Sequence, residues 1–471
     1  MLFVEPPKDY WFVMGEYLPP PYGILQLAAY LENRNKDAEI QVLDCNAEGL
    51  DWKQLENRIE SFDPDIVASS ALATCNTYVA ARTLEIAKKV KPDVLTVAGG
   101  QHFTVLAQES LETYPEIDVI VRGEGEETLV ELAEASGNKR SFSAIEGISF
   151  RNNGTIRHNP PRPLIENLDE LPFPGYHFVE NLLQKYHFTA MAGSARYALI
   201  EGSRGCPHQC TFCTQWRHWG SRWRLKSPKR IADEFKFCIE KYGSRFLWLT
   251  DDNYGLGKRA SELADELIER GFPDDMMWFM QVRCDDVVKH ADVLPKMRKA
   301  GLRWVLLGVE SHSPNTLDSF RKETTPEDAR KAVKLLKEND IFSQGMFIIG
   351  QRKDTAKSMA DLREFANDLN PDLAIFAILT PFPGTAVFEE AKQNGWIQDW
   401  NWANYDMVHA VMPTETLSTK EVQEELYNCY RSFFGSWSRR VGGIFSSKAL
   451  KRKLYRYMAS QGIVKQVKNL F

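Results

Sequence analysis

The sequence lacks several features that would each define a class of protein. It has no run of about 18 uninterrupted apolar residues, so a membrane-spanning helix is not expected. The opening Met1-Leu-Phe-Val-Glu5-Pro-Pro indicates a buried strand that meets a proline loop, without the basic and apolar segments of a signal peptide. Eight cysteines among 471 residues, three of them clustered, fit a reducing compartment better than a disulfide framework. We therefore expect a cytoplasmic protein.

Acidic residues are missing from the C-terminal end. Between Arg431 and Phe471 there are ten Lys or Arg and no Asp or Glu, although the whole chain carries a formal net charge of −6. Such a terminus can contact an anionic membrane surface, or it can be a solvated face over an ordinary core contact. Nucleic-acid binding is not expected, because the acidic remainder would repel phosphate. The aromatic residues among these charges are Phe433, Phe434, Trp437, Phe445, Tyr455, Tyr457 and Phe471.

Short apolar runs alternate with helical patterns over residues 1–140. This alternation predicts a doubly wound parallel α/β sheet, whose ligands bind in loops at the carboxyl ends of the strands. The expected strands are 2–4, 40–43, 66–69, 95–98 and 119–121, with helices over 23–31, 52–62 and 78–90. Glycine is frequent in the following loops, where it allows close approach of the backbone to a ligand.

Residues 141–195 contain several Pro and Asn-Gly turns and are interpreted as a linker. Alternation then resumes over 196–400, where six strand–helix units indicate a parallel, curved partial barrel. Its expected strands are 197–200, 246–249, 278–282, 304–307, 343–349 and 373–378, and 401–471 is expected to be a small helical, basic region.

Three cysteines stand together in Gly205-Cys-Pro-His-Gln-Cys-Thr-Phe-Cys213, directly after the first barrel strand. Cys206, Cys210 and Cys213 can hold three irons of a cubane cluster, because thiolate is the ligand that such clusters use. The fourth iron could then bind a substrate or cofactor. The alternatives are three structural thiols or a zinc site, for which no second cysteine pair is present although His208 is available.

This spacing, with Phe212 before the last cysteine, resembles the signature of the radical S-adenosylmethionine (SAM) superfamily. Nearly the whole chain resembles the cobalamin-binding radical SAM family, which joins a Rossmann-like cobalamin-binding domain to a radical SAM barrel. The resemblance implies a [4Fe–4S] cluster, SAM and cobalamin as cofactors, with an external one-electron donor such as flavodoxin or ferredoxin. It also rests on Pro19 to Gly23, on Gly99-Gly-Gln-His102 and on Gly123-Glu-Gly-Glu126.

The resemblance nominates residues that contact SAM. Phe212 is expected near the adenine, and Asp251, Asp252 and Asn253 near the SAM amine, unless the latter three cap a helix. Arg283 could clamp the SAM carboxylate, or form an ion pair with Asp285 or Asp286. Glu310, at the end of the fourth barrel strand, is expected to meet the SAM ribose or amine.

The cobalamin site is predicted in the loops of the first domain. No Asp-x-His-x-x-Gly run is present, so we expect no protein imidazole on cobalt. His102 would contact the corrin edge or tail, or it is purely structural. The candidates to line the corrin are Thr74, Cys75, Gly99, Gly100, Gln101, His102, Gly123 and Glu126.

Two reactions are consistent with these cofactors. Segments such as Arg204-Gly-Cys-Pro and Lys322-Glu-Thr-Thr325 resemble the anaerobic magnesium-protoporphyrin monomethyl ester cyclases, which implies oxidative chemistry. Asp251-Asp252-Asn253 instead resembles the hopanoid methylases, which implies C-methylation from methylcobalamin. Trp216, Trp219 and Trp223 suit a tetrapyrrole or isoprenoid lipid substrate, or they belong to the core. A methylthiotransferase would need additional cluster cysteines near the N-terminus, and a cobalamin sensor would not explain the cysteine loop.

Overall fold

The computed structural model describes residues 1–8, 17–135, 139–188, 193 and 195–461. The chain divides into two compact units. The first unit comprises 1–9, 20–185 and 401–406, and the second comprises 10–19, 186–400 and 407–471. Phe471 and the last basic residues lie outside the described part. No helix within the described part is long and apolar enough to cross a membrane.

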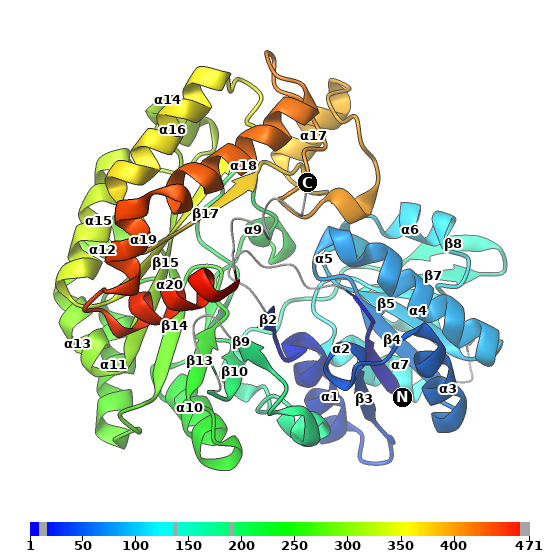
Figure 1. Cartoon of the computed structure of the whole chain (residues 1–471). Coiled ribbons are helices and arrows are strands. Elements are labelled where there is room, and N and C mark those ends of the chain that lie inside the picture. The colour runs from blue at the N-terminus through cyan, green and yellow to red at the C-terminus, as the bar shows by residue number, and fades with distance from the viewer. Residues whose placement is uncertain (9–16, 136–138, 189–192, 194, 462–471) are drawn as a thin grey trace. The chain divides into compact units, whose positions relative to one another are not determined.

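The first unit is built on a seven-stranded sheet with the order β3-β1-β4-β5-β6-β7-β8 (Figure 1). The first five strands in this order pair in parallel, and β7 and β8 add an antiparallel hairpin at one edge. Helices α1 and α7 pack together in one layer, and α3 and α4 in another. The strands are β1 (Leu2–Glu5), β3 (Gln41–Asp44), β4 (Ile66–Ser70), β5 (Leu95–Gly99), β6 (Val119–Val121), β7 (Ile148–Asn152) and β8 (Thr155–His158). The helices are α1 (Tyr22–Arg34), α2 (Cys45–Glu48), α3 (Trp52–Phe62), α4 (Thr77–Val90), α5 (Gln101–Val105), α6 (Ala107–Thr113) and α7 (Glu126–Glu134), with the short 3-10 turns η1 (Thr74–Asn76) and η6 (Trp402–Asn404).

The structure differs from the sequence prediction over 141–195. The part up to Lys185 belongs to the first unit rather than to a linker. Its hairpin, β7 and β8, turns at Asn153 and Gly154, both of which have positive φ angles. The Asn-Gly pair, predicted from the sequence to lie in a linker, therefore forms the tight turn of a hairpin.

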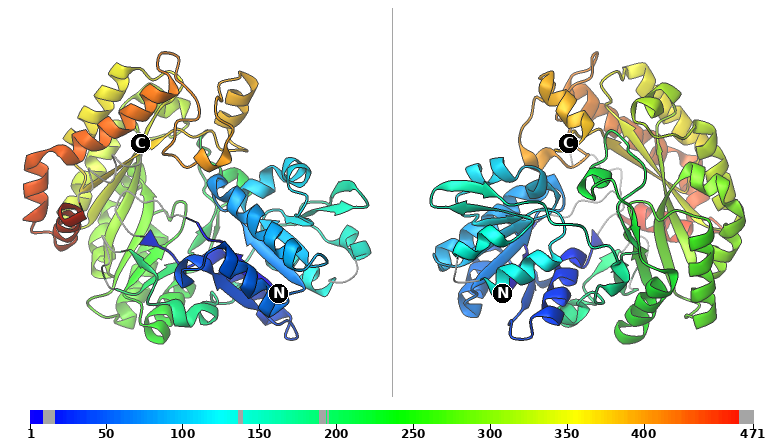
Figure 2. Two further views of the ribbon diagram at one scale, coloured as in Figure 1. Left: turned by 45° about the vertical axis from the view of Figure 1, so that its right-hand side comes forward. Right: turned by 180° about the vertical axis from the view of Figure 1, so that it is seen from behind.

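The second unit is built on six parallel strands in the order β10-β13-β14-β15-β16-β17, which confirms the predicted partial barrel. Figure 2 shows its helices along the outer side of the curved sheet. The strands are β10 (Tyr197–Ile200), β13 (Phe246–Leu249), β14 (Met277–Arg283), β15 (Leu302–Glu310), β16 (Phe342–Ile349) and β17 (Leu373–Ile378). The main helices are α10 (Pro228–Tyr242), α11 (Lys258–Arg270), α12 (Cys284–Lys289), α13 (Leu294–Lys299), α15 (Pro326–Glu338), α16 (Ala356–Leu369), α17 (Ala386–Gln393), α18 (Thr419–Gly435), α19 (Trp437–Ile444) and α20 (Ala449–Gln461).

Local sequence rules explain where the barrel helices begin and end. The Ser227 hydroxyl accepts the Arg230 N–H at the start of α10, Pro228 occupies its first turn, and Gly243 ends it in the left-handed region. Aromatic side chains from neighbouring strands fill the barrel. The Trp304 ring stacks on Phe279 with 4.1 Å between centroids. These contacts pack neighbouring strands against one another inside the barrel.

Candidate functional site

The three clustered cysteines lie on a loop at the carboxyl end of the first barrel strand. The loop leaves from β11 (Ser203–Arg204) and returns through β12 (Arg224–Leu225), and these two short strands pair antiparallel. Gly205 has φ +88°, and a Cβ at this position would lie 2.1 Å from the Arg222 carbonyl oxygen. Only glycine therefore fits where the two arms of the loop cross.

Burial raises the pKa of all three thiols, that of Cys213 to about 12. Deprotonated sulfur is therefore favoured only when a cation is bound. No three His, Cys, Asp or Glu side chains of the described residues could hold a single metal ion. Each cysteine of a cubane cluster binds a different iron, so the three sulfurs need not meet at one point. The donor set fits the cluster.

The aspartates that follow β13 have different environments. Asp251 is fully buried and accepts hydrogen bonds from the Gly202 N–H, at 2.9 Å, and from the Ser203 hydroxyl. It therefore ties β13 to the start of the cysteine loop. Burial and the neighbouring charges of Asp251 and Glu201 raise the pKa of Asp252 to about 7, while a hydrogen bond from Trp219 opposes this shift.

The helix-capping interpretation of these residues is not observed. Helix α11 begins at Lys258, and its N-cap is Gly257, without a side-chain cap. The Asn253 side chain is buried, and its Oδ1 has no hydrogen-bond partner among the described residues. A buried acceptor without a partner fits a bound donor such as an ammonium group. Contact of Asn253 with the SAM amine stays a prediction.

Arg283 and Glu310 end adjacent barrel strands, and both are buried. Arg283 Nε donates to Asp285 Oδ1 at 2.9 Å, which is the ion pair considered as the alternative role. The same side chain donates through Nη2 to the Lys322 carbonyl, whereas the buried Nη1 has no partner among the described residues. That nitrogen is the part of Arg283 that fits a ligand carboxylate.

Glu310 has a partner that the sequence did not indicate. Lys322 Nζ lies 2.7 Å from Glu310 Oε1, and both side chains are less than one tenth exposed. The Lys322 charge also lowers the pKa of the buried Cys210 thiol and so opposes the effect of burial. No periodicity links positions 310 and 322, so only the folded structure reveals the pair. Contact of Glu310 with SAM stays a prediction.

Aromatic side chains surround the cysteine loop. Phe212 is half-buried and packs edge to face on Phe320, with 4.9 Å between centroids. Trp216 donates from Nε1 to the Cys210 carbonyl at 3.0 Å, and Trp219 is hydrogen-bonded to Asp252. Trp216, Trp219 and Trp223 are all half-buried rather than core residues.

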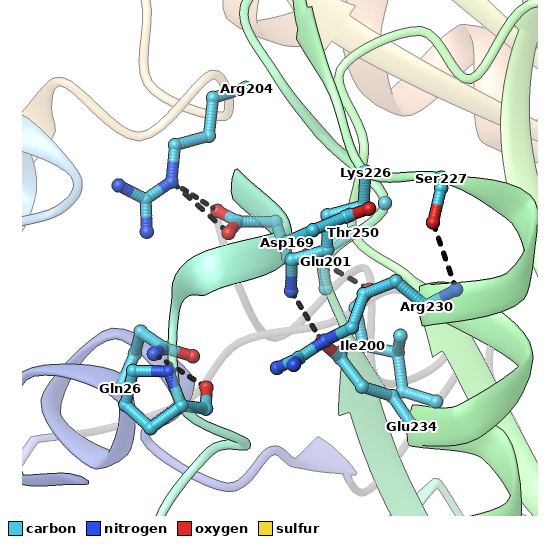
Figure 3. A network of polar contacts seen from close by, with 12 residues as sticks. Gln26, Asp169, Ile200, Glu201, Arg204, Lys226, Ser227, Arg230, Glu234 and Thr250 are labelled. Atoms are coloured by element: carbon cyan, nitrogen blue, oxygen red, sulfur yellow. Dashed lines mark hydrogen bonds and ion pairs between the residues drawn. The ribbon is translucent and has the colours of Figure 1, made fainter. Parts of the chain in front are cut away.

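A buried charge network holds the returning arm of the loop (Figure 3). Lys226 follows β12 directly, and its Nζ lies 2.7 Å from Glu234 Oε1, with both side chains fully buried. Arg230 Nε lies 2.9 Å from the same oxygen. The Lys226 N–H also donates to the Gly202 carbonyl at 2.9 Å. Helix α10 therefore anchors the cysteine loop at the point where it rejoins the barrel.

In the first unit the predicted cobalamin residues follow β4, β5 and β6. The strand order changes direction between β1 and β4, and this switch point is where open α/β sheets bind ligands. Thr74 and Cys75 lie in η1 directly after β4. Gly99 ends β5, Gly100 follows it, and Gln101 and His102 begin α5. Gly123 lies in the loop after β6, and Glu126 begins α7.

Among the predicted cobalamin residues, His102 is a buried histidine with a ring nitrogen that is unpartnered in the described part of the chain. The ring is 3% exposed, its Nδ1 has no hydrogen-bond partner among the described residues, and burial lowers its pKa to about 4. It packs edge to face on Trp402 of η6, with 5.2 Å between ring centroids. Among the described residues of the first unit, the exposed large apolar side chains are Leu72, Tyr78 and Val105, which follow β4 and β5 in the chain. An unpartnered polar atom beside exposed apolar side chains fits a large ring with polar substituents.

Comparison with known proteins identifies two known domains in the chain. Residues 14–133 match the B12 binding domain, and 200–366 match the radical SAM superfamily. The chain is 33% identical over 88% of its length to an uncharacterized methyltransferase of Pyrococcus horikoshii, of which it covers 88%. It is also 33% identical over 88% of its length to an anaerobic magnesium-protoporphyrin IX monomethyl ester cyclase of Rubrivivax gelatinosus, of which it covers 74%.

A solved structure shares the fold of the whole chain. The radical SAM methyltransferase TsrM of Kitasatospora setae, with cobalamin and a [4Fe–4S] cluster bound, superimposes with a TM-score of 0.72 at 17% identity, over 100% of this chain and 99% of that one. The sequence relatives, the two matched domains and the cysteine loop lead to the same conclusion. The chain belongs to the cobalamin-binding radical SAM family and is a radical SAM enzyme whose cofactors are a [4Fe–4S] cluster, SAM and cobalamin.

Proposed function

We propose that the enzyme removes hydrogen from an unactivated carbon of a hydrophobic tetrapyrrole or isoprenoid substrate and then oxidises that carbon, as the magnesium-protoporphyrin ester cyclases do. The observation that carries this proposal is the 33% identity to a cyclase over 88% of the chain. The three half-buried tryptophans beside the cysteine loop support a large, flat substrate, because indole rings pack well on apolar ring systems.

The cofactors supply the difficult chemistry when bound: one-electron cleavage of SAM at the cluster, and methyl or redox chemistry at cobalt. The side chains of this protein hold and orient these groups. Cys206, Cys210 and Cys213 would ligate iron, and Asn253 Oδ1 and Arg283 Nη1 would bind the polar groups of SAM. The buried setting of these atoms excludes water from the reacting centre. An external one-electron donor such as flavodoxin or ferredoxin would reduce the cluster.

C-methylation is the second candidate reaction. It is supported by the 33% identity to an uncharacterized methyltransferase and by Asp251-Asp252-Asn253, which resembles the hopanoid methylases. The two reactions differ in the fate of the SAM methyl group. In C-methylation that group enters the product, whereas oxidative cyclisation leaves the product without it.

An anaerobic assay with methyl-deuterated SAM distinguishes the candidates. Reconstituted protein, reduced flavodoxin and magnesium-protoporphyrin monomethyl ester are incubated, and the products are read by mass spectrometry. An unlabelled product with added oxygen or lost hydrogen, formed together with 5′-deoxyadenosine, is expected. A product that carries a deuterated methyl group would refute cyclisation. A parallel incubation replaces the porphyrin ester by an apolar cell extract. If the porphyrin ester gives no product while a compound of the extract gains label, both cyclisation and the tetrapyrrole substrate are refuted.

We also propose that the C-terminal helices contact an anionic membrane surface. Trp437, Val441 and Phe445 stand at every fourth position along α19 and its C-cap, so they lie on one face. They are 78%, 46% and 75% exposed. Gly443 faces the other way, because a Cβ there would lie 2.2 Å from the ring of Tyr455 on α20. The apolar face therefore points away from the helix that α19 packs on.

Charge supports this assignment. From Ser436 to Gln461 the chain has seven Lys or Arg and no Asp or Glu. Lys448 and Lys451 pair with the buried Asp372, at 3.1 and 3.0 Å. Arg452 and Arg456 donate to backbone carbonyls, which do not neutralise them. An apolar face flanked by positive charge suits anionic headgroups. Phe433, Phe434 and Tyr455 are buried and belong to the core instead.

Sedimentation with lipid vesicles tests the membrane proposal. The protein should bind vesicles that contain phosphatidylglycerol and not pure phosphatidylcholine, and added salt should weaken binding. The double variant W437S/F445S should lose binding. The matched control W400S removes another exposed tryptophan, one distant in sequence from α19, and should bind normally. Equal binding by both variants, or no binding to anionic vesicles, would refute the proposal.

A further inference from the structure

The chain returns to the first unit after it has completed the barrel. Residues 401–406 belong to the first unit, although 400 and 407 belong to the second. The segment has its own order: the Asn401 side chain accepts the Ala403 N–H at 3.2 Å and starts the turn η6. Trp402 and Tyr405 are buried and pack edge to face, with 4.8 Å between centroids. The turn is therefore a defined part of the first unit.

This turn lies at the ligand-binding edge of the first sheet. It packs on η1, which follows β4, and on the start of α4, where the Trp402 N–H donates to the Tyr78 hydroxyl at 3.3 Å. Trp402 also packs on His102, which follows β5. Burial raises the pKa of the Cys75 thiol, and the charge of Asp406 raises it further, so the two side chains lie near each other. The segment thus meets predicted cobalamin residues from two loops beside the switch point.

The atoms at this edge match the chemistry of a corrin. A corrin is a broad ring with apolar faces, and its rim carries acetamide and propionamide groups. Leu72 is 71% exposed after β4, and Val105 is 43% exposed at the end of α5. His102 Nδ1 is buried without a partner among the described residues. Burial lowers the pKa of His102 to about 4, so the imidazole is neutral at pH 7. Depending on the tautomer, its Nδ1 can accept from an amide N–H or donate to an amide carbonyl.

We propose that residues 401–406 form a wall of the cobalamin site, in which Trp402 orients His102 so that Nδ1 bonds a rim amide of the corrin. The matched B12 binding domain ends at residue 133, so this wall comes from a segment far outside it. The inference rests on the cofactor and not on the reaction, so it holds for oxidation and for methyl transfer alike.

Binding of hydroxocobalamin to the cluster-reconstituted full chain tests the proposal. Affinity is read from the visible absorbance of the corrin and from equilibrium dialysis, without SAM or substrate. Trp402→Ala should weaken binding about tenfold or more, because buried tryptophans dominate binding energy at such contacts. Trp402→Phe keeps an aromatic partner for His102 and should stay within about threefold of the natural protein. The matched control Trp400→Ala changes a tryptophan of the second unit and should leave the affinity unchanged.

A second pair of variants tests the hydrogen bond. His102→Gln keeps a polar group and should weaken binding less than His102→Leu, which removes it. Iron content and 5′-deoxyadenosine formation from SAM report on the second unit and should stay normal in all variants. Natural affinity in W402A, or equal losses in W402A and W400A, would overturn the wall. Equal affinities of H102Q and H102L would overturn the hydrogen bond, even where W402A fails to fold. A failed cyclase assay would leave these affinities unaffected.

Discussion

Removing the charge of Glu234 should release the cysteine loop. Glu234 is fully buried, and one of its oxygens accepts both Lys226 and Arg230. The variant E234Q preserves the shape but leaves the fully buried Lys226 ammonium without a counter-charge. Breaking a buried ion pair in this way costs about 3–5 kcal/mol, which at 4 kcal/mol is roughly a thousandfold in the folding equilibrium. We expect a loss of this size in the free energy of unfolding of the second unit.

The assay is urea unfolding of cluster-free protein, followed by tryptophan fluorescence. All tryptophans except Trp52 and Trp402 belong to the second unit, so the signal reports mainly on that unit. The iron bound per chain after reconstitution measures the loop itself. Lost iron in E234Q, at a urea concentration where the unit is still folded, would show that the loop detaches first.

Two further variants make this reasoning refutable. The double variant K226M/E234L replaces the fully buried pair by apolar side chains of similar volume and should recover most of the lost stability, since the remaining partner of Glu234, Arg230, is partly exposed. The control E262Q breaks the exposed Lys258–Glu262 pair and should change stability by less than about 1 kcal/mol. A loss in E234Q no larger than that in E262Q would refute the reasoning. A double variant no better than E234Q would assign the effect to packing instead of charge.

Three shorter predictions follow. C206A should lose the visible absorbance of the cluster and all 5′-deoxyadenosine formation, whereas C238A, which removes a buried thiol of α10, should keep both. The folded-state pKa of Asp252 is about 7, above its ordinary 3.8, so its stabilising contribution is present at low pH and is lost as the pH rises through 7. In urea titrations of cluster-free protein, D252N should therefore lose less stability between about pH 5 and 8 than the natural protein does. An equal loss of stability in both proteins would contradict this. G100A should weaken cobalamin binding and lower the thermal unfolding midpoint, since φ is +96° and the new Cβ would lie 2.5 Å from the Ala71 carbonyl oxygen; an unchanged visible spectrum and midpoint would argue against it.

Regular elements could be predicted from the sequence because their periodicities are local. The predicted helix 52–62 agrees with α3 to the residue, and the barrel strands agree within about two or three positions. The cysteine loop was also predictable, since its three ligands lie within eight consecutive residues. Helix caps such as Ser227-Pro228 reinforce these predictions, because they depend on neighbours in the chain.

Features that depend on tertiary structure could not be predicted in this way. Lys322 reaches Glu310 because Arg321 and Glu323 adopt positive φ angles around it, which their side chains do not favour. No local pattern marks Lys226 and Glu234 as a buried pair, and only the docking of α10 buries them. The hairpin β7–β8 was hidden by turn residues that also occur in linkers.

The return of residues 401–406 to the first unit has a consequence for biosynthesis. During translation, the amino-terminal sheet emerges first and can begin to fold, but its carboxyl-end loops lack Trp402 until the entire barrel has been made. His102 and its neighbours would meanwhile expose the surface that the later segment covers. Completion of the cobalamin-binding unit is therefore coupled in time to synthesis of the radical SAM unit, so a ribosome that stalls within the barrel releases a first domain that lacks its last turn.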